Sequence, residues 1–153
     1  ASGLYGQLKA ESDAGNDDEY DISGFSGHFA LAFPQGHGFS GEVYSGTNLG
    51  GYNGAIGLAG TVDGVASKGG WVSAWAKVSP QFTLGAGVGR DDPDDADVAA
   101  NSRCKNQAYF GNIQYAVVPQ ASIGFELSQW ETSYKGAEKA KNLRAQTSFI
   151  LNF

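Results

Sequence analysis

The chain has 153 residues, which suits one domain, and no apolar run in it approaches the roughly 18 residues that a membrane-spanning helix needs. Its formal net charge of −6 argues against a nucleic acid as partner, and its single cysteine excludes an internal disulfide. Because neither an initiator methionine nor a signal-peptide h-region opens the chain, we expect a processed or excised piece.

Apolar and polar residues alternate with the period of a β-strand along most of the chain. Cut by turn signals, this pattern predicts eight strands, near residues 3–11, 20–33, 37–46, 70–78, 81–90, 105–117, 121–134 and 141–153. The apolar stretch 55–62 leaves the count open, because it could add a ninth and a tenth strand or form a short loop helix.

Short and long connections alternate between these strands. The short ones, 34–36, 79–81 and 118–120, each contain a proline, which has no N–H to donate and therefore lies where a strand ends. The others are longer and polar: 12–19, 47–69, 91–104 and 135–141. Short turns at one end and long loops at the other are typical of outer-membrane barrels. We therefore predict an all-β fold, an antiparallel transmembrane β-barrel, with residues 1–153 as one domain or barrel segment and 47–69 and 91–104 as its long loops.

The predicted strands have an apolar and a polar face. Apolar candidates for the lipid side are Phe29, Leu31, Phe33, Phe82, Leu84, Ala86, Val88, Tyr109, Ile113, Tyr115, Ile123, Phe125, Leu127, Leu143, Phe149, Leu151 and Phe153. The alternate positions are small or polar: Thr83, Gly85, Gly87, Gly89, Asn112, Gln114, Ser122, Gly124, Glu126 and Ser128. A soluble barrel would reverse this and place its apolar side chains inside. Aromatic residues near the strand ends, as in an interfacial girdle, favour the polar-inside assignment.

Charged residues fall on the face that this assignment turns inward. They are Lys9, Glu11, Glu42, Lys77, Glu126 and Arg144. Opposite charges in one lumen can pair, and paired or solvated charge is tolerable there. We expect them to hold the wall together or to lie in water, with a selectivity role as the open alternative, since charged rings set ion preference in pores.

The densest charge cluster lies in the predicted loop 91–104. It consists of Asp91, Asp92, Asp94, Asp95 and Asp97. Carboxylate oxygens are the ligands that Ca²⁺ prefers, so a divalent ion is one interpretation, although the run lacks the pattern of a calcium-binding hand. The other interpretation is a solvated extracellular loop. No zinc spacing, phosphate-binding loop or catalytic arrangement stands out, so we predict no enzyme, no cofactor and no firm metal site.

Alternation along the last strand is unbroken, and Phe149, Leu151 and Phe153 end it on an apolar face. This resembles the last strand of Gram-negative outer-membrane barrels, in which the terminal aromatic strand is the assembly signal. From Asn48 onwards the chain resembles the carboxy-terminal half of porin-like proteins. The residues that carry this resemblance are 48–52, 68–71, 91–97, 105–107, Pro119, Gln120, Glu126, Trp130, Thr132, Tyr134, Arg144, Gln146, Ser148 and Phe153.

The resemblance implies a location in the bacterial outer membrane and a barrel of around sixteen strands, of which this chain would supply half. It implies passive diffusion of small polar solutes, and lipid, lipopolysaccharide and the barrel assembly machinery as partners, with a homo-oligomer open. Two alternatives remain: a small closed outer-membrane barrel with a structural or surface-binding role, and a soluble β-sandwich binding module.

Overall fold

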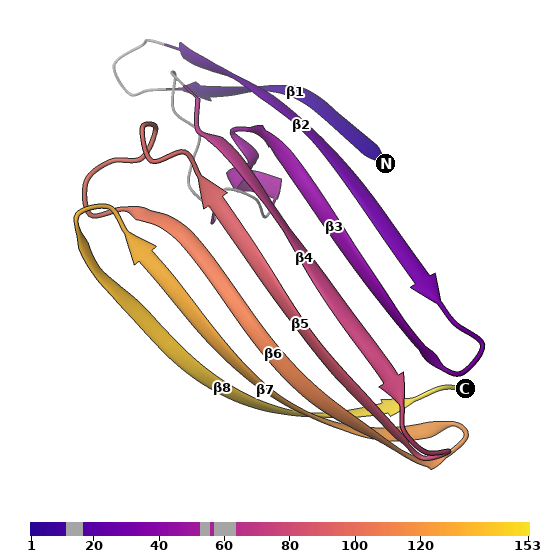
Figure 1. Ribbon diagram of the computed structural model, residues 1–153. Coiled ribbons are helices and arrows are strands. Elements are labelled where there is room, and N and C mark those ends of the chain that lie inside the picture. Colours follow the sequence, from indigo (N-terminus) through magenta and orange to yellow (C-terminus); the bar gives the residue numbers. More distant parts are fainter. Residues whose placement is uncertain (12–16, 53–55, 57–63) are drawn as a thin grey trace.

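The chain folds into one antiparallel β-sheet. The computed structural model describes residues 1–11, 17–52, 56 and 64–153, with the backbone alone described at residues 8, 10, 11, 17 and 18. The strands follow chain order across the sheet: β1 (Ser2–Glu11), β2 (Asp17–Ala32), β3 (His37–Thr47), β4 (Ala66–Lys77), β5 (Phe82–Pro93), β6 (Arg103–Val118), β7 (Ala121–Tyr134) and β8 (Ala137–Leu151) (Figure 1). The eight predicted strands are thus confirmed.

The sheet is a curved single layer that does not close on itself (Figure 1). In the described part of the chain, β1 pairs with β2 alone and β8 with β7 alone, so both outer strands present a free edge. The connections that follow β2, β4 and β6 gather at one end, and those that follow β1, β3, β5 and β7 at the other, as predicted (Figure 1). We call these the turn end and the loop end.

The predicted long connection 135–141 is wrong. β7 ends at Tyr134 and β8 begins at Ala137, so that only Lys135 and Gly136 lie between them. Gly136 has a φ of 76°, which a glycine adopts without the steric cost that a side chain would bring, and this permits the tight turn. The polar residues from Ala137 to Lys141 therefore belong to β8 and extend it towards the loop end.

Strand β4 also begins earlier than predicted, at Ala66, and β5 continues to Pro93, so the loops that flank them are shorter than expected. Between β3 and β4 the chain forms a short 3-10 helix, η1 (Leu49–Tyr52). Of the stretch 55–62, only Ile56 belongs to the described residues, and the prediction for the rest falls outside them. Among the described residues, no helix is long and apolar enough to cross a membrane.

The register confirms the two predicted faces. Phe82, Tyr115, Ile123 and Phe149 are successive partners across β5 to β8, so their side chains share one face. The row Leu84, Ile113, Phe125 follows on the same face. We call this the apolar face and the opposite one the polar face.

Little of the apolar face is covered. Phe125 is 44% exposed and Phe149 79% exposed, as expected for surface residues rather than core. The buried apolar side chains of the described residues are Ile22, Leu49, Val65, Val98 and Cys104, and all of them lie near the loop end. The fold therefore packs its loops against the sheet and leaves the apolar face of the strands without a second layer.

Aromatic rings lie directly over glycines on the polar face. A Cβ added at Gly38 would come within 2.5 Å of the Trp75 ring, and one added at Gly87 within 2.5 Å of the Phe110 ring. Each pair consists of direct cross-strand partners. Such aromatic cover is a known way to stabilise glycine in a sheet, and it keeps the polar face thin.

We expect Gly87→Val to destabilise the sheet by about 1–3 kcal/mol, the usual cost of overpacking, because the new side chain would displace the Phe110 ring. Urea unfolding followed by tryptophan fluorescence measures this. Gly27→Val is the matched control, since nothing lies within 4 Å of a Cβ at Gly27. Equal loss of stability in the two variants would show that the ring does not fill the space above Gly87.

Candidate functional site: the polar face of the sheet

Four of the six predicted lumen charges share the polar face. Glu42 pairs in register with Trp71, Lys77 with Thr83, Glu126 with Asn112, and Arg144 with Ser128. None of these four side chains takes part in an ion pair among the described residues. They are spread over the face as separate charges, so the expected ion pairing of the wall is not what holds it together there.

The structure places Lys9 on the face opposite to the one predicted. In the register of β1 it alternates with Tyr5 on the apolar side, and its Nζ lies 2.5 Å from Oε1 of its cross-strand partner Glu19. The sequence predicted Lys9 on the face that turns inward. The structure places Lys9 near the loop end instead, past the apolar side chains of that face. Glu11 lies in β1, and its side chain falls outside the described residues.

Lys9 belongs to a belt of charge that ends the apolar face on the loop side. Arg90 contacts Asp92 at 2.5 Å, and Lys105 contacts the same carboxylate at 3.7 Å. Lys139 and Lys141 both contact Glu131, at 2.7 and 3.5 Å. Exposed pairs of this kind add little to stability. Their position shows instead that the apolar part of the face is bounded.

The five aspartates of the acidic run do not converge on one point. Asp91 points to the polar face, where its Oδ2 accepts a hydrogen bond of 2.7 Å from the Ile56 amide, whereas Asp92 takes part in the charged belt. Asp94 accepts from the Ala96 amide, and Asp97 from the Ala66 amide across the loop. In the described ranges no group of three or more His, Cys, Asp or Glu side chains is placed to hold a metal ion. Asp91 and Asp92 lie in β5, so the predicted solvated loop contains only Asp94, Asp95 and Asp97.

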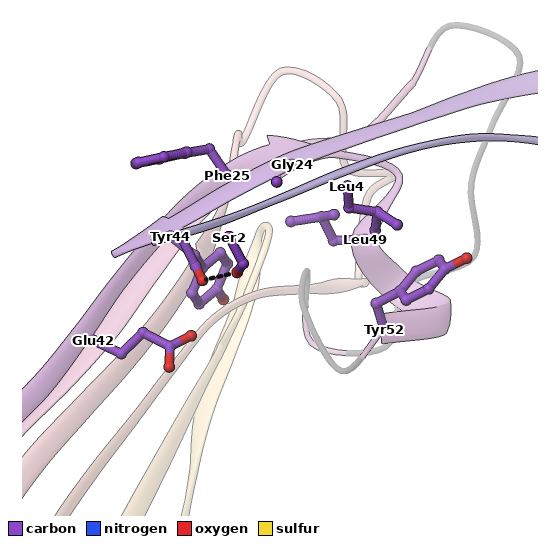
Figure 2. A pocket seen from close by; sticks show the side chains of 10 residues that line it. Ser2, Leu4, Gly24, Phe25, Glu42, Tyr44, Leu49 and Tyr52 are labelled. Carbon is purple, nitrogen blue, oxygen red and sulfur yellow. Dashed lines mark hydrogen bonds between the residues drawn. The ribbon is translucent and has the colours of Figure 1, made fainter. Parts of the chain in front are cut away.

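The β3–β4 connection folds back onto the polar face, which the sequence did not indicate. Asn48, at a φ of 55°, donates from Nδ2 to the Asp21 carbonyl and accepts at Oδ1 from the Val65 amide. Leu49 then lies over Gly24 and Gly46, where a Cβ would come within 2.9 Å of its methyl groups. Figure 2 shows η1 on the side of Tyr44 and Glu42, with Phe25 on the other side.

This arrangement encloses a depression of about 370 Å³ at the loop end, which Ser2, Glu42, Tyr44, Leu49 and Tyr52 help to line (Figure 2). A second depression, of about 90 Å³, lies nearer the turn end among Asn112, Gln114, Glu126 and Gln146. Both are open, the first lined by apolar and polar side chains and the second mainly by polar ones. The polar face therefore carries shallow recesses and is not a packed interior.

Cys104 lies beyond the apolar part of the face, at the start of β6, and is buried. Burial and the neighbouring Asp95 carboxylate raise the pKa of its thiol above the ordinary value, in spite of the adjacent Lys105. The flanking basic residues therefore do not activate it, and the thiol packs under the loop.

No protein-family model matches the chain. The comparison with curated proteins and the comparison with solved structures also return no match. The function therefore has to be argued from the two faces of the sheet.

We expect Asn48→Gly to loosen the β3–β4 connection by about 1–3 kcal/mol, because the variant tolerates the positive φ but loses both side-chain hydrogen bonds. Limited proteolysis of the folded protein measures this as faster cleavage within 48–65. Asn142→Gly, at an exposed position in β8, is the control. Equal cleavage rates in the two variants would contradict the anchoring role of Asn48.

Proposed function

We propose that the chain forms part of the wall of a porin-like channel in a bacterial outer membrane, through which small polar solutes diffuse passively. The observation that carries this is the uncovered apolar face on a single-layer antiparallel sheet. Side chains such as Leu84, Ile113 and Leu127 have 43%, 38% and 47% of their surface exposed. Contiguous apolar surface of this kind marks a membrane or protein interface when it exceeds a few hundred Å².

Lipid suits this face better than another protein layer for two reasons. The apolar residues extend over seven strands, β2 to β8, rather than forming one local patch, and the charged belt bounds them on the loop side. A membrane barrel presents such a band of limited height to the acyl chains. The basic residues of the belt would then lie at the level of lipid headgroups and lipopolysaccharide phosphates.

The free edges of β1 and β8 favour a wall segment over a complete small barrel. Unpaired backbone N–H and C=O groups cost several kcal/mol each in hydrocarbon, so spanning sheets must close. In this proposal further strands pair with both edges and complete a wider barrel, of around sixteen strands if the resemblance holds. The thin polar face, with its rings over glycine, leaves room for water in such a lumen.

The two other candidate functions find less support. A small closed barrel requires β1 to pair with β8, which the described strands do not do. A soluble β-sandwich requires a second sheet about 10 Å away that covers the apolar face. Nothing in the described part of the chain covers it.

The direct test is reconstitution into lipid. We expect the full-length protein to need detergent, to migrate differently on gels before and after heating, and to produce discrete conductance steps in planar bilayers. A protein that stays monodisperse without detergent and shows no heat-dependent mobility would contradict the membrane assignment. A protein that inserts without conductance would favour the structural role instead.

We expect Leu127→Arg to block assembly or to destabilise the sheet in lipid by about 2–4 kcal/mol, the cost of arginine near the bilayer midplane. Gln146→Arg, on the polar face of the neighbouring strand, is the matched control and should assemble normally. Folding yield into lipid vesicles, read from the heat-dependent gel shift, measures both. If Gln146→Arg proved the more damaging change, the assignment of the two faces would be inverted.

We expect a cation preference that weakens as salt rises, because acidic groups outnumber basic ones and salt screens their field over about 8–10 Å. The double variant Glu42→Gln, Glu126→Gln removes negative charge from the polar face and should move the reversal potential under a KCl gradient towards zero. Glu131→Gln, in the outer belt, should leave it unchanged. The opposite ranking of the two variants would place the conducting path on the other side of the sheet.

A further inference from the structure

All three tryptophans of the chain lie on the polar face. Trp71 and Trp75 alternate along β4, and Trp130 is the cross-strand partner of Ala108. In a membrane protein, tryptophan is expected in the lipid-facing interfacial belt, so this placement calls for another reason. Trp75 has one, because it covers Gly38. Trp71 and Trp130 are 41% and 37% exposed and cover no glycine.

Trp71 and Trp130 border a slot with a small-residue floor. Trp71, Gly89, Ala108 and Trp130 are successive register partners across β4, β5, β6 and β7. The slot is a depression of about 280 Å³. A Cβ at Gly89 would make only ordinary contacts, the nearest at 3.5 Å to the Trp71 Cβ, so the space above this glycine is open. Gly87, two residues away, is by contrast filled by Phe110.

Each of the two indole rings makes a contact of its own. The Trp71 ring leans towards His28, with 6.1 Å between the ring centroids. The Trp130 indole donates from Nε1 to the hydroxyl of Ser128, a residue that is 3% exposed. Neighbouring strands are about 4.8 Å apart, so the backbones of β4 and β7, which carry the two rings, are roughly 14 Å apart. A recess of about 280 Å³ whose rings come from separate strands suits a molecule of about two sugar rings better than the compact aromatic cage that holds a trimethylammonium group.

One rim of the slot offers both hydrogen-bond donors and acceptors. It carries Tyr44, Asp91 and Asn106, which belong to the next row of the face, with Gly69 between Tyr44 and Asp91. Oδ1 of Asp91 is buried, so Asp91 gives the rim negative charge, and the Tyr44 hydroxyl is the group there that can accept from a ligand or donate to it. Asn106 accepts from Thr132 at Oδ1, which orients its amide nitrogen as a donor. Hydroxyl groups satisfy such a mixed rim, whereas an anion would be repelled by Asp91.

We propose that the slot between Trp71 and Trp130 binds a neutral saccharide of about two rings, whose apolar ring faces stack on the indoles while its hydroxyls bond to the rim. This proposal rests on the proposed function and extends it, because it names the class of solute that would bind transiently to the channel wall. Stacking on an exposed indole orients a sugar without holding it tightly, and weak binding is compatible with passage.

Titration of the protein in detergent with cellobiose tests the proposal without requiring conductance. We expect a saturable change in tryptophan fluorescence in the wild type. Gly89→Val fills the floor, with a Cβ that makes only ordinary contacts, and should weaken binding by about tenfold or more. Gly27→Val, an equally open glycine on the apolar face, should bind like the wild type. The gel shift on heating confirms that both variants are folded.

Three results would overturn the slot: no saturable change in the wild type, equal binding by Gly89→Val, or saturable binding of choline chloride with the same dependence on Gly89. The last would assign the site to organic cations. Because no bilayer is involved, cellobiose binding by a protein that fails to conduct would sink the channel and leave the saccharide site standing. A protein that conducts but does not bind cellobiose would contradict the saccharide site and leave the proposed channel standing.

Discussion

The structure depends on one constraint: an apolar face that no other part of the described chain covers. In a water-soluble fold this face would be packed against a second layer, since burial of apolar surface is the main favourable term in folding. Here the sheet stays single, and the buried apolar side chains, among them Leu49 and Val65, join loop to sheet near one end. Hydrogen bonds between neighbouring strands hold the sheet together, and the surroundings of the protein have to cover its apolar face.

The polar face follows from the same constraint. Because no second layer lies opposite the polar face in the described chain, its side chains have nothing to pack against there. Instead, Trp75 lies over Gly38 and Phe110 over Gly87, which explains why glycine recurs on the polar face. Gly89 has no ring over it and lies between Trp71 and Trp130 in register, so that this position is a recess in the face.

Much of the fold could be predicted from sequence because period two is a strong signal over long strands. The register places Phe125, Leu127 and Phe149 together as expected. Tight turns that depend on one left-handed glycine, such as Gly136, are weaker signals, and the polar residues after it imitate a loop. The inward fold of the β3–β4 connection depends on the Asn48 side chain and on contacts distant in sequence, which no local pattern reveals. The tryptophan slot was within reach of the sequence, since Trp130 has the opposite parity to Leu127, but its floor required the register.

The central claim, that the apolar face meets lipid, can be measured through the native tryptophans because all of them lie on the other face. In vesicles, water-soluble acrylamide should quench their fluorescence and brominated acyl chains should not. A Leu127→Trp variant should add emission that the brominated chains quench strongly. Quenching of the native tryptophans by brominated lipid, with a Leu127→Trp signal open to acrylamide alone, would contradict this account.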